Sequence, residues 1–158
     1  MSLSHLNAIE VEALRRLNSG GVEFVVVGGH AVLHYTGLPH SNGESRTLGD
    51  LDLFVSVEAP NLDRLKVAMA GLGWVSDSAN LDSLASGATV NIERYRVQFL
   101  PKVSGVSWER VWRDRVSVYS SAGNVWLIAL GDLITNKKAA GRTKDLNDVE
   151  ALEAIYAA

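Results

Sequence analysis

Two aspartates separated by one residue, Asp50 and Asp52, are the side chains of this sequence best suited to chemistry. Residues i and i+2 of a strand lie on the same face, so the two carboxylates are expected side by side. They repel each other unless a cation lies between them, and Mg²⁺ binds one or two carboxylates together with substrate phosphates. The pair therefore predicts a site for Mg²⁺ (or Mn²⁺). The alternative, a solvated strand face, is weakened because Asp is depleted in strands.

A glycine pair, Gly28-Gly29, follows the continuous apolar run 24–27 and precedes a predicted helix at 30–35. Without Cβ atoms, the two glycines let backbone N–H groups approach a ligand, and a helix N-terminus favours anions. The turn is neither a Walker A loop nor a G-x-G-x-x-G dinucleotide fingerprint. A turn made only for packing explains the glycines alone equally well.

Basic and hydroxyl side chains that can contact phosphate occur in two further places. Arg46-Thr47 precedes the Asp pair, and the C-terminal group consists of Lys137, Lys138, Arg142 and Lys144. For both groups the alternative is ordinary solvated surface.

Apolar patterning predicts the elements that position these residues. Helices are expected at 5–18 with Ser4 as cap, at 30–35, from Pro60 to about Gly71, after Ser107 as cap, and over 130–157 with a break at Gly141 and a further cap at Thr143. Strands are expected at 23–27, 50–57, 88–93, 95–100, 116–120 and 125–128, and loops at 37–49 and 76–87. This order predicts an α+β fold, a mixed β-sheet with helices packed on it. We expect one domain, 1–158, with the C-terminal helices packed against its core.

The composition is that of a globular domain: 158 residues, 47% hydrophobic, 21% charged, and a net charge of −3. The slight acidity disfavours a dedicated nucleic-acid binder. There is no cysteine, which excludes thiolate metal sites and fits a cytoplasmic protein. No apolar run approaches the ~20 residues of a membrane span, so no membrane partner is expected.

The segments Val26–Ala31 and Arg46–Leu53 resemble the glycine-pair and Asp-x-Asp signature of the nucleotidyltransferase superfamily, which has the polymerase-β-like fold. The chain is most similar in pattern to small prokaryotic members, including toxin-like ones of the abortive-infection type. Those members carry a C-terminal Lys-x-x-x-Gly-Arg-x-Lys-Asp-x-x-Asp pattern. It is matched here by Lys137, Gly141, Arg142, Lys144, Asp145 and Asp148.

The resemblance implies transfer of a nucleoside monophosphate from a nucleoside triphosphate to an acceptor hydroxyl or amine. The acceptor would belong to a protein, a tRNA or a small molecule, and a cognate partner protein would be possible. Asp50 and Asp52 would hold two Mg²⁺ (or Mn²⁺) ions with a third carboxylate, and Lys137 would face the triphosphate as part of the catalytic group. Nucleotide contacts are implied for Gly28, Gly29, Arg46, Thr47, Lys137, Arg142, Lys144 and Asp145.

One position departs from the family pattern. Where relatives carry the third carboxylate, this chain has Gln98, whose neutral amide is a weak metal ligand and no base. Gln98 therefore supports an alternative function, a degenerate module that binds nucleotide or a partner protein. Trp108, Trp112 and Trp126 could offer it an interaction surface, although the i, i+4 spacing of the first two favours a core-facing stripe. His30 and His34 have the same spacing, without the further ligand that a metal pair needs.

Overall fold

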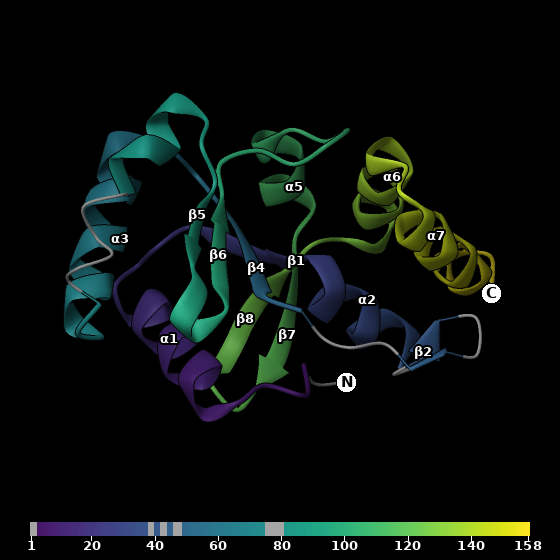
Figure 1. Cartoon of the computed structure of the whole chain (residues 1–158), viewed down its shortest axis with the longest axis horizontal. Coiled ribbons are helices and arrows are strands. Elements are labelled where there is room, and N and C mark those ends of the chain that lie inside the picture. Colours follow the sequence, from purple (N-terminus) through teal and green to yellow (C-terminus); the bar gives the residue numbers. More distant parts are fainter. Residues whose placement is uncertain (1–2, 38–39, 42–43, 46–48, 75–80) are drawn as a thin grey trace.

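The computed structural model describes residues 3–37, 40–41, 44–45, 49–74 and 81–158. Six strands form one mixed sheet in the order β5-β6-β4-β1-β8-β7 (Figure 1). They are β1 (Phe24–Val27), β4 (Leu51–Val55), β5 (Val90–Ile92), β6 (Val97–Leu100), β7 (Val116–Ser120) and β8 (Gly123–Leu127). The pairs β4–β6 and β1–β8 are parallel, and the other neighbours are antiparallel. The predicted α+β class with a mixed sheet is confirmed.

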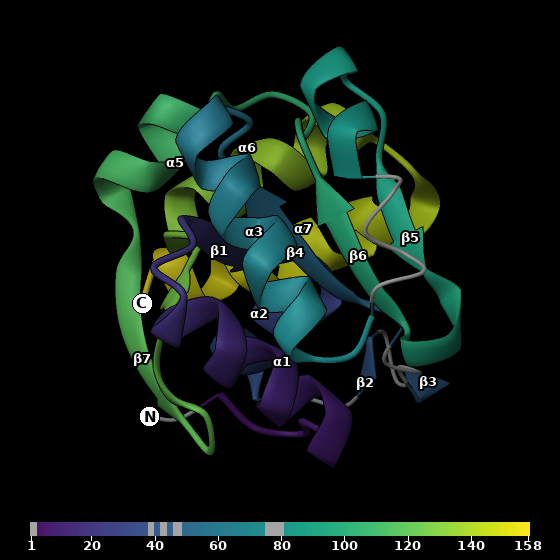
Figure 2. The same cartoon turned by 90° about the vertical axis from the view of Figure 1, so that its left-hand side faces the viewer.

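Helices cover both faces of the sheet. They are α1 (Ala8–Ser19), α2 (Gly28–Thr36), α3 (Ala59–Gly71), α5 (Trp108–Asp114), α6 (Leu130–Ala140) and α7 (Thr143–Tyr156). Figure 2 shows α1 and α3 in front of the sheet, with α6 and α7 behind it. Helix α2 lies on the same side as α6 and α7 in Figure 1. None of the helices in the described ranges is long and apolar enough to cross a membrane.

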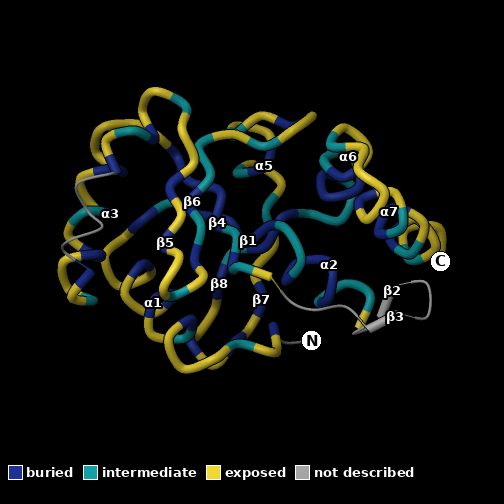
Figure 3. Tube along the Cα trace, in the orientation of Figure 1, coloured by how far each residue is buried: buried dark blue, intermediate teal, exposed yellow. Residues whose placement is uncertain are grey.

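The centre of the sheet is the most deeply buried part of the chain (Figure 3). All four residues of β1 are buried, as the continuous apolar run predicts for a strand covered on both faces. Asn61 of α3 joins this centre to the helical layer: its side chain accepts from the Glu23 N–H at 2.7 Å and donates to the Ser56 carbonyl at 2.8 Å. The buried amide is therefore satisfied where β1 begins and β4 ends.

Two of the three predicted helix caps are wrong, and the third is confirmed, because the Ser107 hydroxyl accepts from the Arg110 N–H at 3.2 Å and caps α5. Asn7, not Ser4, caps α1, because its Oδ1 atom accepts from the Glu10 N–H and the Glu10 carboxylate in turn accepts from the Asn7 N–H. Arg142, not Thr143, precedes α7, and Asp145 accepts from the Arg142 N–H in the same way at 3.2 Å.

Two predicted loops contain short regular elements. The 3₁₀ helix η1 (Leu81–Ser86) lies within the loop expected at 76–87, and its Leu81 and Leu84 are fully buried. Their spacing of three suits a 3₁₀ turn, whose side chains i and i+3 eclipse. Within 37–49, β2 (His40–Ser41) pairs with β3 (Glu44–Ser45). A second 3₁₀ turn, η2 (Glu93–Tyr95), links β5 to β6.

Candidate functional site

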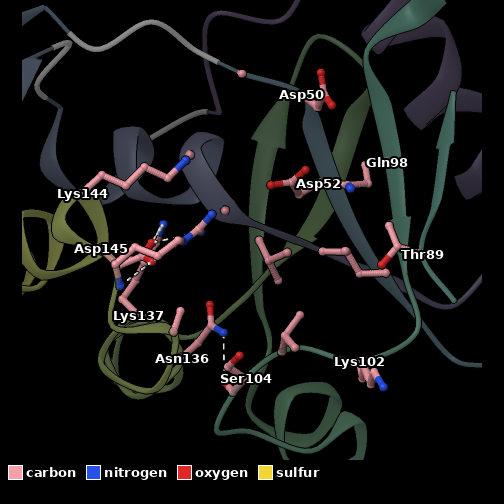
Figure 4. Close-up of a pocket in the computed structure, with 18 residues that line it drawn as sticks. Asp50, Asp52, Thr89, Gln98, Lys102, Ser104, Asn136, Lys137, Lys144 and Asp145 are labelled. Carbon is pink, nitrogen blue, oxygen red and sulfur yellow. Dashed lines mark hydrogen bonds and ion pairs between the residues drawn. The ribbon is translucent and has the colours of Figure 1, made fainter. Parts of the chain in front are cut away.

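A cleft of about 600 Å³ separates one edge of the central strands from α6 and the start of α7 (Figure 4). This volume lies within the range of small-molecule sites, ~300–1,000 Å³. The sheet side contributes Val27, Gly28, Gly29, Gly49, Asp50, Asp52, Thr89, Gln98, Leu100 and Lys102. The opposite wall, from α6 and the start of α7, contributes Asn136, Lys137, Ala140, Arg142, Lys144 and Asp145. Chain segments far apart in sequence thus bring carboxylates and cations to one cleft.

Asp52 lies directly against Gly28. The β1–β4 register pairs Asp52 with Val27, the residue before the turn. Gly28 has φ +69°, and a Cβ atom there would lie only 2.3 Å from the Asp52 Oδ2 atom. Gly28 is also the first residue of α2, where backbone N–H groups lack helical partners and the dipole favours an anion. The glycine therefore supplies both a left-handed backbone and the space for the carboxylate.

The Asp52 carboxylate is largely buried and lies near a second carboxylate, and both features destabilise its charged form. Burial, followed by the neighbouring Asp50 carboxylate, raises the pKa of Asp52 to about 6. The nearby His30, Lys137 and Lys144 side chains act to lower the pKa of Asp52 and only partly offset this rise. A cation bound between the two carboxylates would relieve the repulsion.

Asp50 precedes the first residue of β4 and already has a cationic partner. The Arg96 Nε atom lies 3.3 Å from the Asp50 Oδ1 atom. Arg96 itself adopts φ +56°, a left-handed conformation that is uncommon outside glycine, at the turn between η2 and β6. Part of the Asp50 charge is therefore offset from within the chain.

Gln98 occupies the place beside Asp52. Strands β4 and β6 run parallel with Asp52 paired to Gln98, and β5 continues the same row with Asn91. Glu93, the carboxylate nearest in sequence, is exposed on η2 and does not line the cleft. Over the described ranges, no group of three His, Cys, Asp or Glu side chains could hold a metal. The carboxylate and amide side chains that line the sheet side of the cleft are those of Asp50, Asp52 and Gln98.

On the opposite wall, Lys137 is buried and held between two acids. Its Nζ atom lies 3.3 Å from Asp145 Oδ1 and 3.2 Å from Asp148 Oδ2. The Arg142 Nε atom donates to Asp145 Oδ2 at 2.7 Å. Burial acts to raise the pKa of Asp145, but Arg142 and Lys137 outweigh it and hold the pKa below its usual range. The structure thus brings Lys137 to the cleft while two buried carboxylates match its charge.

Lys144 is differently placed from Lys137. Its side chain is exposed and extends toward the cleft from the first turn of α7 (Figure 4). Asp145 is fully buried, so it lies at the cleft as a support for Arg142 and Lys137 more than as a surface for ligand. Gly28, Gly29, Arg142 and Lys144, for which the resemblance implies nucleotide contacts, all line the cleft. Arg46 and Thr47 lie outside the described residues.

A buried pair that the sequence did not reveal lies beneath the glycine turn. The His30 Nε2 atom is 3.4 Å from the Glu10 Oε2 atom, and both side chains are nearly inaccessible. Burial acts to raise the pKa of Glu10, but hydrogen bonds from His30 and the Asn7 N–H hold it below its usual range. The Asn7-x-x-Glu10 pattern could have indicated the cap, but not the contact with α2. His30 thus pairs with Glu10, and His34 contacts the Tyr35 ring edge-on.

Trp108, Trp112 and Trp126 pack mainly against one another and against the core. Trp108 stacks on Trp112 at 5.3 Å between centroids and meets Phe54 edge-on at 5.1 Å. The Arg115 guanidinium lies 3.7 Å from the Trp112 ring centroid and 4.2 Å from that of Trp126. These contacts support the core-facing interpretation of the Trp108/Trp112 spacing.

Comparison with known proteins places this cleft in a family context. No curated protein and no solved structure matches the chain. A family model does match, over residues 6–158, and its description is "Nucleotidyl transferase of unknown function (DUF2204)". The match includes the glycine turn, both aspartates and the α6–α7 wall. The chain belongs to this family of nucleotidyl transferases.

Proposed function

We propose that this nucleotidyltransferase moves a nucleoside monophosphate from a nucleoside triphosphate to an acceptor hydroxyl or amine, with Mg²⁺ or Mn²⁺ as cofactor. One observation carries the proposal: Asp52 is seated on the Gly28 turn, facing Arg142 and Lys144 across one cleft. A hard cation on the carboxylate side and basic side chains on the other are what a polyphosphate requires.

The residues present suit a divalent ion. Their donors are hard oxygens, and the absence of a Cβ atom at Gly28 leaves the Asp52 carboxylate its space. Asp50 and Asp52 would hold the ion, to which Gln98 can add only a neutral oxygen. When bound, such an ion polarises phosphoryl oxygens and makes an attacking hydroxyl more acidic.

The remaining residues bind and orient the nucleotide. The N–H groups at Gly28 and Gly29 face the phosphates at the start of α2, and Lys144 and Arg142 offset their charge from the other wall. Arg46 and Thr47 are proposed as further phosphate contacts. Lys137 stays paired and keeps Asp145, and with it Arg142, in place.

The acceptor and the cellular role are further parts of the proposal. The acceptor would be a protein side chain, a tRNA end or a small molecule, and the net charge of −3 disfavours long nucleic acids. A toxin-like role with a cognate partner protein is supported by the sequence resemblance, and a cytoplasmic location by the need for nucleoside triphosphates. Growth arrest on expression, lost in an Asp52→Asn variant, would test the toxin role.

One observation favours a second function. Because Gln98 stands in register with Asp52, the chain lacks a charged third ligand at that place. A module that binds nucleotide or a partner protein without transfer would fit this donor set.

Labelled nucleoside triphosphates separate the two functions. The purified protein is incubated with each labelled triphosphate, Mg²⁺ or Mn²⁺, and cell lysate as acceptor. We expect label transfer that Asp52→Asn abolishes and Asp63→Asn leaves unchanged, since Asp63 is exposed on α3 at the opposite face of the sheet. Triphosphate binding without transfer would support the binding module, and neither binding nor transfer would refute both.

A further inference from the structure

We infer that the cleft holds one divalent ion together with its nucleotide, where the nucleotidyltransferase resemblance implies two. The inference rests on the proposed function and concerns the number of ions at the same site. It follows from which oxygen donors three neighbouring strands bring together, and from which charges already surround them.

The donor row across the sheet is too weakly charged for two ions. Paired metal sites have ions ~3.5–4 Å apart, and carboxylates must offset the repulsion between them. The register aligns Asp52 of β4 with Gln98 of β6 and Asn91 of β5. Only the first of these three side chains carries a negative charge. A carboxylate or two together with substrate phosphates is instead the ordinary environment of a single Mg²⁺ ion.

The second carboxylate, Asp50, already forms an ion pair with an arginine. The Asp50 Oδ1 atom accepts from the Arg96 Nε–H at 3.3 Å, so a guanidinium already lies beside one of the two oxygens of this carboxylate. Strand β6 begins at Val97, one residue after Arg96, so the same segment supplies a cation beside Asp50 and a neutral amide beside Asp52. Both features lower the affinity of this edge for additional positive charge.

Basic side chains on the opposite wall can take over part of the role of a second ion. Lys144 and Arg142 line the cleft facing the two aspartates, and both are exposed at the start of α7. Basic side chains at this position can offset the charge of the outer phosphates, which is part of what a second ion would do.

Counting bound ions tests the inference without measuring transfer. The protein is dialysed to equilibrium with Mn²⁺ and the α,β-methylene analogue of each nucleoside triphosphate, and protein-bound Mn²⁺ and analogue are both quantified. We expect one Mn²⁺ per bound analogue for the natural chain and two for Gln98→Asp, which adds a carboxylate beside Asp52. The matched control is Asn91→Asp, which adds the same charge in the same row but one strand further out and away from the cleft-lining residues; its count stays at one.

The possible results are distinct. Two Mn²⁺ ions per bound analogue in the natural chain, or none, would overturn the inference while leaving nucleotide binding intact. A count of one in Gln98→Asp that is folded by circular dichroism would also overturn it, since Gln98 would not then limit the number of ions. If no analogue is retained at all, the proposed function fails, and the inference fails with it.

Discussion

Replacement of Gly28 by alanine should damage the site and the fold by separable amounts. Gly28 has φ +69°, and its added Cβ would meet Asp52 Oδ2 at 2.3 Å and Cγ at 3.1 Å. The left-handed backbone costs a non-glycine residue ~1–2 kcal/mol. Moving the Asp52 side chain off its rotamer adds ~0.5–1.5 kcal/mol. The free energy of unfolding should therefore fall by about 1.5–3.5 kcal/mol, and the melting temperature by roughly 3–14 °C.

Gly37→Ala is the matched control for the backbone effect. Gly37 ends the same helix at φ +63°, but no atom lies within 4 Å of its hypothetical Cβ. This variant should lose only ~1–2 kcal/mol and keep its nucleotide and Mn²⁺ affinity. In Gly28→Ala the displaced Asp52 should weaken Mn²⁺ binding and lower transfer by ~100-fold, the usual effect of a ~1 Å misplacement.

A double-mutant cycle isolates the contact between Gly28 and Asp52. In an Asp52→Ala background the carboxylate is absent and only the Cβ atom of residue 52 remains, 3.2 Å from the added Cβ, so Gly28→Ala should cost only slightly more than Gly37→Ala does. Urea unfolding of the four proteins should give a coupling energy of ~0.5–1.5 kcal/mol between the two positions. A coupling energy near zero, or a Gly28→Ala protein with unchanged Mn²⁺ affinity, would refute the assignment of Gly28 as the seat of the Asp52 carboxylate.

Three further predictions concern charged residues. The pKa of Asp52 is about 6 against a usual 3.8, so between these pH values the folded chain binds more protons than the unfolded chain. The free energy of unfolding therefore falls as pH rises through that window, by at most about 3 kcal/mol. Urea unfolding from pH 4 to 8 should show this slope, and the slope should be flattened in Asp52→Asn. Lys144→Ala should weaken binding of the triphosphate analogue without altering the melting temperature. Lys137→Met leaves two buried carboxylates without their ammonium partner and should lower the free energy of unfolding by ~3–5 kcal/mol. Equal effects of the two changes on binding and stability would contradict this division of roles. Glu10→Ala removes both the α1 cap and the partner of a buried imidazole, so calorimetry should show a loss of ~2–4 kcal/mol, against ~0.5 or less for the exposed Glu12→Ala.

The sheet and most of the cleft follow from local sequence signals. The unbroken apolar run of β1, the alternation around Asp52 and the break at Gly141 each act within a few residues, so they predict strands and helices nearly where the structure has them. The resemblance then placed Gly28, Asp52 and Lys144 in one site without any knowledge of strand order.

Long-range contacts are what the sequence could not predict. Glu10 meets His30 across twenty residues of chain, and Arg96 meets Asp50 across forty-six, because strand order and not local propensity brings them together. The prediction for Lys137 shows the same limit. Its position on α6 was readable from the motif, but its burial between Asp145 and Asp148 depends on how α7 packs on α6.

The position of Asp52 and the number of ions beside it depend on different strands. Asp52 is held by the β1–β4 register and by the space at Gly28, neither of which involves the side chain of Gln98. Gln98 enters from β6, where a change of side chain at a half-buried position leaves the backbone ladder with β4 intact. A substitution there can therefore change the oxygen donors beside Asp52 while the cleft wall formed by α6 and α7 stays in place. We therefore expect Gln98→Asp to change the number of bound ions without abolishing nucleotide binding.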